Sequence, residues 1–242
     1  MPELRDKLKS RDNCGVCGKP LVYGTEAVER ACRYCGQVVK AQIYCPEGHY
    51  VCDACHAREA LDVLRQAAAG TKSKSPAEIA EAVMSHSSVP MHGPEHHAIV
   101  AASIVAAVRN AGYTVPDGAV EKTIGRASKV PGGWCGICGD CGAAVGVGIA
   151  VSVLTGATPL TGKPRSLAMA ATTFAMSRMI DDQPRCCKKA VRKGLDAAVV
   201  FLRDKIGIVL PAQGKVACAY SERNQQCAKA ECPYYSGRGE TP

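Results

Sequence analysis

The chain has 242 residues, of which 47% are hydrophobic and only 5% aromatic, and its formal net charge is +8 at pH 7. This length allows one sizeable core or two smaller units, and so few aromatic side chains argue against large surfaces for stacking ligands. The basic residues are spread along the chain. Charge alone therefore does not decide between simple solubility and an anionic partner, such as a nucleic acid or a phosphorylated or carboxylated metabolite.

The first residues, 1–9, are charged and contain no apolar stretch of the kind found in secretory signals. We therefore expect a cytoplasmic protein whose 15 cysteines are reduced thiols or metal ligands. The odd number of cysteines argues against a simple disulfide framework. Their grouping in C-x-x-C pairs agrees, because two thiolates at that spacing close on one metal ion through a tight turn.

Residues 14–58 hold seven cysteines and two histidines, and we predict that they form a small metal-binding module. Two C-x-x-C-G knuckles are followed by a Cys-Pro-Glu-Gly-His motif and a further C-x-x-C pair, which together offer eight ligands for two zinc ions. These ligands are Cys14, Cys17, Cys32, Cys35, Cys45, His49, Cys52 and Cys55. With four protein ligands on each ion, both sites would be closed and structural.

The spacing leaves the pairing of these ligands open. In a sequential arrangement the first two knuckles hold one ion. In an interleaved arrangement each ion takes one early and one late set of ligands, which is slightly favoured because the last pair stands at a helix start, as in a treble-clef finger. The interleaved sets are Cys14, Cys17, Cys45 and His49 for one ion, and Cys32, Cys35, Cys52 and Cys55 for the other.

A polar stretch at 70–76 is expected to link this module, residues 1–69 ending in a helix, to an all-α domain over 77–242. Proline near the starts and glycine near the ends of apolar segments predict a series of helices. They are expected at 76–86, 94–111, 117–129, about 142–155, about 165–181 and about 185–206, before a cysteine-containing tail, 211–242. The predicted fold class is mainly α, with a zinc-ribbon or treble-clef-like N-terminal module.

The motif Met-His-Gly-Pro-Glu-His-His at 91–97 stands at the start of an otherwise apolar helix. Imidazoles and a carboxylate at such a place suit acid–base catalysis or metal binding. The candidate catalytic residues are His92, Glu95, His96 and His97. The alternative is that Glu95 caps the first helical turn and the histidines are exposed.

A second cysteine group begins with Cys135, Cys138 and Cys141, each followed by glycine and together leading into a helix. Three thiolates at C-x-x-C spacing wrap one face of a [4Fe–4S] cubane, and the helix N-terminus favours an anionic cluster. Cys186 and Cys187, before another helix, are the candidates for the fourth ligand. Adjacent cysteines rarely bind one metal together, so one of the two can be simply a small buried residue.

Cys218, Cys227 and Cys232 in the tail are the alternative to this pair, either as the fourth ligand or as part of a separate site. Two other interpretations of the knuckle at 135–141 stay open, a third zinc site and a redox dithiol.

One uncharged stretch, 141–162, could be mistaken for a membrane span. Gly, Ser, Thr and Pro interrupt it, and its continuous apolar run is shorter than the ~20 residues that a bilayer requires. A buried helix is therefore predicted, and no membrane partner is expected.

Over nearly its whole length the chain resembles a family of uncharacterised Cys-rich domains found mainly in anaerobic bacteria and archaea, sometimes fused to methyltransferase or radical-SAM modules. The similarity rests on CGVCG, CPEGHYVCDACH, MHGPEHH, GWCGICGDCGAA, PRCCKKA and the final cysteines ending in Cys232-Pro-Tyr. No activity comes with this resemblance. It implies an anaerobic setting, in which an oxygen-sensitive cluster is feasible, and an association with methyl or radical chemistry.

Together these features predict a metalloprotein with two structural zinc ions and an iron–sulfur cluster. It is expected to act in anaerobic metabolism as a cluster-dependent enzyme or accessory protein, in sulfur-transfer, lyase or redox chemistry, on a small anionic substrate or with a redox partner. One alternative is a non-catalytic zinc module that docks a protein partner or, less favoured, a nucleic acid. The other is a metal-handling or redox-sensing protein.

Overall fold

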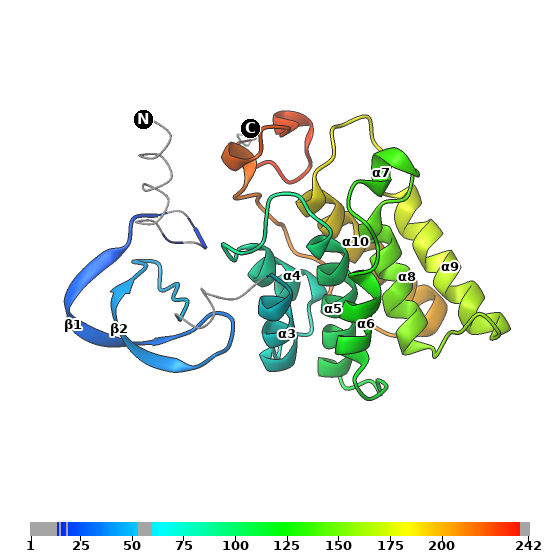
Figure 1. Ribbon diagram of the computed structural model, residues 1–242, viewed down its shortest axis with the longest axis horizontal. Helices are drawn as coiled ribbons and strands as arrows, with labels where there is room; N and C mark the ends of the chain where they lie inside the picture. The colour runs from blue at the N-terminus through cyan, green and yellow to red at the C-terminus, as the bar shows by residue number, and fades with distance from the viewer. Residues whose placement is uncertain (1–13, 15, 18, 53–59, 238–242) are drawn as a thin grey trace.

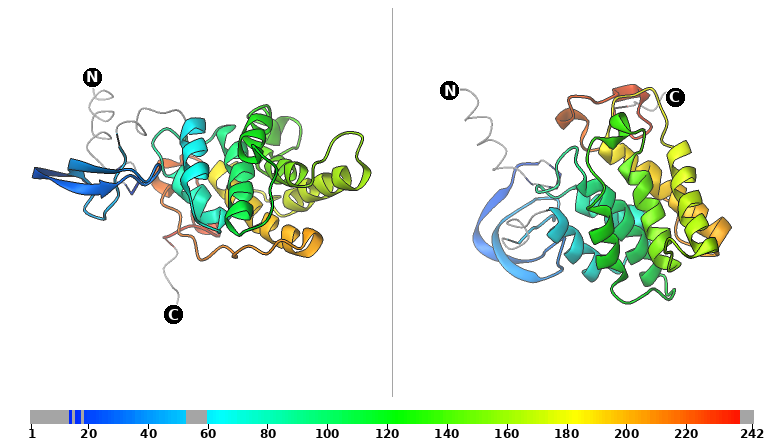
Figure 2. Two further views of the ribbon diagram at one scale, coloured as in Figure 1. Left: turned by 90° about the horizontal axis from the view of Figure 1, so that it is seen from below. Right: turned by 45° about the vertical axis from the view of Figure 1, so that its right-hand side comes forward.

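The computed structural model of the chain describes residues 14, 16–17, 19–52 and 60–237. A small β-hairpin stands to one side of a body of helices (Figure 1). The two further views in Figure 2 show the same division, with the hairpin projecting from the edge of the helical body. The prediction of a mainly α protein is confirmed, whereas a zinc-ribbon fold for the N-terminal part stays a prediction.

The hairpin consists of β1 (Val22–Ala31) and β2 (Val38–Tyr44), which pair antiparallel so that the start of β1 lies opposite the end of β2. The chain turns between the strands at 32–37, where Gly36 has a φ of +72°, a conformation that glycine adopts without a steric penalty. Ala41 is the one buried residue of β2. So little buried apolar surface cannot by itself hold a two-stranded sheet together.

Eight helices form the body, counted over the described residues. They are α3 (Ala60–Gly70), α4 (Pro76–Met84), α5 (Glu95–Asn110), α6 (Ala119–Ala127), the short α7 (Trp134–Ile137), α8 (Gly142–Leu154), α9 (Gly162–Ser177) and α10 (Cys187–Phe201). A π-helical turn, η1 (Leu202–Ile206), extends α10, and the tail contains two short 3-10 turns, η2 (Ser221–Arg223) and η3 (Lys229–Glu231). The six helices predicted between 76 and 206 are all present with ends shifted by a few residues, and α7 is additional.

Helix α5 is the centre of the body and contacts α3, α4, α6, α8 and α10. Nearly all of its residues are buried, as expected of a helix that is apolar on all sides. It lies close to α8, because a Cβ added to Gly146 of α8 would stand only 2.6 Å from the carbonyl oxygen of His97. The glycine thus permits the close approach that places the start of α5 beside the start of α8.

The uncharged segment of the sequence forms α8, most of which is buried in the body, as predicted. Within the part of the chain that the structure describes, no helix has both the length and the apolar character needed to cross a bilayer.

The linker expected at 70–76 falls between α3 and α4. Helix α3 precedes it, yet packs against α4, α5 and α6. Its fully buried side chains Val63 and Leu64 belong to the same apolar core as the side chains of α5. The division into domains at 1–69 and 77–242 stays a prediction.

Candidate metal centres

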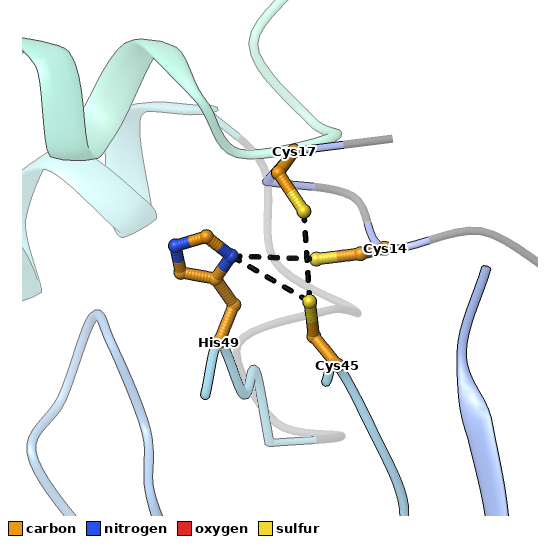
Figure 3. A group of neighbouring side chains, drawn as sticks. All are labelled: Cys14, Cys17, Cys45 and His49. Carbon is orange, nitrogen blue, oxygen red and sulfur yellow. Dashed lines mark hydrogen bonds between the residues drawn. The ribbon is translucent and has the colours of Figure 1, made fainter. Parts of the chain in front are cut away.

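Cys14, Cys17, Cys45 and His49 converge at the open end of the hairpin (Figure 3). Their ligand atoms all lie within 4.8 Å of one another. The distances are 3.5 Å between the sulfurs of Cys17 and Cys45, 3.7 Å from Cys45 Sγ to His49 Nδ1, and 4.0 Å from Cys14 Sγ to His49 Nδ1. A zinc ion bound tetrahedrally holds its ligand atoms roughly 3.5–3.8 Å apart, so this group has the size of a mononuclear site.

A second group forms at the turn of the hairpin from Cys32, Cys35 and Cys52, whose sulfurs also lie within 4.8 Å of one another. The sulfurs of Cys35 and Cys52 are 3.8 Å apart, and the backbone N–H of Cys52 donates to Cys32 Sγ at 3.5 Å. Burial by itself would raise the pKa of Cys32, but backbone N–H groups outweigh it and lower the pKa to about 7, which favours the thiolate. The expected fourth ligand, Cys55, lies outside the described residues.

These two groups have the composition of the interleaved arrangement, and the hairpin supplies the physical reason. An antiparallel pair brings the segment before β1 beside the segment after β2, so the first knuckle meets Cys45 and His49. The second knuckle is the turn between the strands, at the opposite end. The chain returns to that end after His49, where the backbone N–H of Arg33 donates to the carbonyl of Tyr50 at 2.9 Å.

In the helical body, cysteines and histidines from three distant segments line one cavity of about 240 Å³. The thiols come from two of these segments, the continuous stretch from the loop around α7 to the start of α8 and the start of α10. The imidazoles come from the third, the start of α5. These residues are Cys135, Cys141, Cys187, His92, His96 and His97. A neighbouring cavity of about 360 Å³ shares Cys135, Cys141 and Cys187 and adds Cys186. The predicted histidine and cysteine motifs thus share one region of the body.

The knuckle at 135–141 is the outermost part of this region. Cys135 and Cys138 are exposed, and Cys138 lines neither cavity. Cys141 is half-buried at the N-cap of α8, and burial raises the pKa of its thiol. Burial likewise raises the pKa of Cys187, the first residue of α10.

Two of the histidines are held in a defined orientation. His96 Nδ1 donates to the carbonyl of Gly93, and His97 Nδ1 donates to the carbonyl of Val130, both at 3.1 Å. Because a carbonyl only accepts, each Nδ1 carries the proton and each Nε2 keeps a lone pair. Burial lowers the pKa of His96 to about 3 and also lowers that of His97, so both are neutral imidazoles. His96 Nε2 has no hydrogen-bond partner among the described residues.

The alternative interpretation with exposed histidines is wrong for this motif. His96 and His97 are buried, with 1% and 8% of their surfaces exposed, and His92 Nε2 donates to Oδ1 of Asn224 at 3.2 Å. Glu95 belongs to the first turn of α5 but does not line the cavity of the histidines. Its catalytic role stays a prediction.

The tail cysteines lie elsewhere. Cys218, Cys227 and Cys232 line a separate cavity together with Cys186, and Cys187 does not border it. Cys186 therefore borders both this cavity and the cavity of about 360 Å³ near the knuckle, whereas Cys187 borders the two cavities near the knuckle.

Residues 64–235 match the family of unknown function DUF5714. The match spans well over half of the chain. This protein belongs to the DUF5714 family. Neither the curated proteins nor the solved structures contain a match to it. In this DUF5714 member the matched region contains the eight cysteines of the body and tail and none of the seven of the N-terminal module, so a property common to the family is to be sought in the helical body.

Several groups that shape the cavities of this DUF5714 member have no local sequence signal. Asn224 reaches His92 from 132 residues away, and the carbonyl of Val130 orients His97 from a loop. Gly142, in contrast, could have been singled out from the sequence, because it directly follows a cysteine of the knuckle. A Cβ at Gly142 would lie 2.3 Å from His97 Nε2, so glycine is required for the histidine to stand beside Cys141.

Proposed function

We propose that this protein is a metalloprotein in two parts, in which the N-terminal module holds two structural zinc ions and the helical body holds an iron–sulfur cluster. The zinc ligands would be Cys14, Cys17, Cys45 and His49 for one ion. Cys32, Cys35, Cys52 and Cys55 would bind the other. Support comes from the ligand spacing of the two groups and from the small buried core of the hairpin, which leaves its stability to metal binding.

The observation that carries the proposal for the body is the shared cavity, in which Cys135, Cys141 and Cys187 meet three imidazoles. The knuckle thiolates Cys135, Cys138 and Cys141 would bind the cluster, and Cys187 would either supply the fourth ligand or leave one iron open. The sulfurs of this region do not converge as closely as the ligand atoms of the N-terminal groups. Among the described residues, three ligand atoms come within 4.8 Å of one another only in the module. Wider spacing suits a cubane, which binds each thiolate through a different iron.

An iron–sulfur cluster at this place supplies a Lewis-acidic iron where one iron is open, or a one-electron carrier where all are ligated by protein. The chain contributes the acid–base groups and the positive charge. Neutral His96 and His97 have Nε2 lone pairs that can accept a hydrogen bond from a bound molecule. Arg185 lines both cavities and suits an anionic group. We propose that the protein acts as a cluster-dependent enzyme or accessory protein on a small anionic substrate, in sulfur-transfer, lyase or redox chemistry.

Anaerobic purification followed by metal and sulfide analysis tests this proposal. We expect zinc at two ions per chain, iron and sulfide in equal amounts, and the broad visible absorbance of an iron–sulfur centre. Cys141→Ser should lower the iron content and leave zinc unchanged, and the matched variant Cys45→Ser should lower zinc and leave iron unchanged. Protein without iron or visible absorbance, but with more than two zinc ions per chain, would instead support the non-catalytic zinc protein.

A further inference from the structure

The tail folds back over the first turns of α10 and is held there by specific contacts (Figure 1). Cys218 and Tyr235 form an isolated parallel bridge, and the backbone N–H of Cys218 donates to the carbonyl of Tyr234 at 2.7 Å. Tyr234 Oη donates to Asp196 of α10 at 3.3 Å. These contacts bring three cysteines of the tail to the N-cap residue of α10, Cys186.

Four thiols line the cavity between the tail and α10. They belong to Cys186, Cys218, Cys227 and Cys232. Each of these cysteines is half-buried. Four thiols around one cavity are the full ligand set of a tetrahedral zinc ion or of a [4Fe–4S] cluster.

Backbone N–H groups point at three of the four sulfurs. Cys186 Sγ accepts from the N–H of Lys189 at 3.5 Å, Cys218 Sγ from that of Tyr220 at 3.4 Å, and Cys227 Sγ from that of Lys229 at 3.4 Å. Such donors stabilise a thiolate relative to a thiol. For Cys218 and Cys227 the donor stands two residues after the cysteine, as it does in the N-terminal module, where the N–H of Glu47 donates to Cys45 Sγ at 3.4 Å. The tail thus repeats a local geometry of the candidate zinc ligands.

The tail contains one unusual backbone conformation, at Lys229, whose N–H donates one of these hydrogen bonds. Lys229 has a φ of +47°, the only positive φ of a non-glycine residue among the described residues. A lysine in the left-handed region costs free energy, of order 1 kcal/mol or more. That conformation presents the N–H of Lys229 to Cys227, which ties the strain to the thiol.

Charge around the cavity favours an anion. Lys189 and Arg192 line it, and their side chains are only 9% and 3% exposed. Each has one acidic partner, Asp181 for Lys189 at 3.0 Å and Glu81 for Arg192. Lys188, also buried, donates to the carbonyl of Met84 at 2.9 Å and has no acidic side chain within ion-pair distance among the described residues. A cluster held by four thiolates is negative, and these cations would offset its charge.

The spacing of the sulfurs decides between the two ligand classes. Tetrahedral zinc requires sulfurs roughly 3.8 Å apart. Within the described part of the chain, three ligand atoms come within 4.8 Å of one another in the two N-terminal groups and nowhere in the tail. A cubane binds its four thiolates farther apart, because each is on a different iron. Cys232 is also followed by proline, as is the last cysteine of a bacterial ferredoxin run.

We infer that Cys186, Cys218, Cys227 and Cys232 bind a second iron–sulfur cluster, separate from the one proposed at Cys135–Cys141. Assembly takes ferrous and ferric iron in equal amounts and sulfide from the medium, so that the iron already has the oxidation states of a [4Fe–4S]2+ core, and the four thiols lose their protons to the solvent as iron–thiolate bonds form. With four protein ligands this cluster has no open iron, which distinguishes it from a substrate-binding centre. Adjacent Cys186 and Cys187 then serve different clusters, which places the two centres next to each other.

Iron analysis of the full-length chain, reconstituted anaerobically with ferrous iron, ferric iron and sulfide, tests this inference. We expect about eight iron atoms per chain for the unaltered protein, and about four for Cys218→Ser/Cys227→Ser. Cys135→Ser/Cys141→Ser should also retain about four, and the combination of all four substitutions almost none. Ser236→Ala is the matched control, because its hydroxyl donates to the carbonyl of Cys218 without being a ligand, and it should keep all the iron.

The pattern of retained iron separates the two proposals. The inference is overturned if the tail variant keeps the full iron content, if zinc rather than iron fills the tail site, or if the folded tail variant and the knuckle variant both lose all their iron. Circular dichroism checks folding, and Mössbauer spectra of the single variant Cys227→Ser report a changed ligand in a protein that keeps both clusters. Loss of all iron in the tail variant, with full iron in the knuckle variant, would instead remove the cluster at Cys135–Cys141 and leave the tail cluster standing.

Discussion

The N-terminal module and the helical body are each stabilised internally by a different kind of interaction. In the hairpin, apolar side chains such as Val38 and Ile43 are 59% and 48% exposed, and the close approaches are those between ligand atoms. In the body, α5 is almost entirely buried among five other helices. The first region has groups that could hold a metal ion in place of an apolar core, whereas the second has a core of its own. Cysteines in the two regions therefore have different roles.

The spacing of the thiols follows this difference. In the module the sulfurs and the imidazole nitrogen stand at 3.5–4.0 Å, the distance that one ion imposes. In the described part of the body and tail, thiols line cavities, and no three ligand atoms come within 4.8 Å of one another. The region that matches the family is the second one. Compact ligand groups that could hold single ions and cavities lined by thiols are thus separated along the chain.

The largest effect is expected when the metal bound by the N-terminal module is removed. We expect a strong chelator, or Cys45→Ser in one site, to abolish the protection of the hairpin amides against hydrogen exchange. Structural zinc contributes about 10–16 kcal/mol of apparent binding free energy to such modules. Amides of α5 and α8 should keep their protection. A hairpin that stays protected without zinc would contradict the distinction between the two regions.

Truncation of a core side chain should affect the body by a smaller amount. Leu64 of α3 is fully buried, so Leu64→Ala should lower the free energy of unfolding of the helices by about 2–5 kcal/mol in urea titrations followed by circular dichroism. The matched variant Val38→Ala, on the exposed surface of β2, should leave the unfolding of the helices unchanged. Equal effects of the two variants would show that the hairpin and the helices share one core.

The contact of α8 with α5 provides a third test. Gly142→Ala would place a Cβ 2.3 Å from His97 Nε2, which should cost about 1–3 kcal/mol of unfolding free energy and alter the iron–sulfur absorbance. Gly125→Ala in α6 is the control, since no atom lies within 4 Å of that Cβ, and it should stabilise the helix by about 0.5–1 kcal/mol. Two variants that behave alike would mean that His97 does not stand against α8.

The smallest effect is expected at the surface of α3. Arg65 pairs with Asp62 and with Glu121 of α6 at 2.8 and 3.0 Å, but its side chain is 41% exposed. Arg65→Ala should therefore cost less than about 1 kcal/mol in the same urea titration. A loss as large as that of Leu64→Ala would show that ion pairs, and not apolar burial, attach α3 to the body.

Much of the local structure was predictable because its causes are local. Ser75 and Pro76 mark the start of α4, where Ser75 Oγ accepts from the N–H of Glu78 at 3.3 Å. Apolar periodicity located the other helices, and C-x-x-C spacing identified the pairs of thiols that close through one turn. The burial of His96 and His97 was not predictable, because it depends on α8 and on Val130, which reach the start of α5 only in the folded chain.

The sequence by itself thus determined which residues carry thiols and imidazoles, which of them are neighbours in a turn, and where most helices begin and end. Only the tertiary structure decided which distant groups meet. The antiparallel hairpin brings Cys45 and His49 to the first knuckle, and the return of the tail brings Cys218, Cys227 and Cys232 to Cys186. Of the two adjacent residues at the start of α10, only Cys186 reaches the tail cavity and only Cys187 reaches the cavity of the histidines. Side chains one residue apart at a helix start point in different directions, a fact that spacing along the chain does not contain.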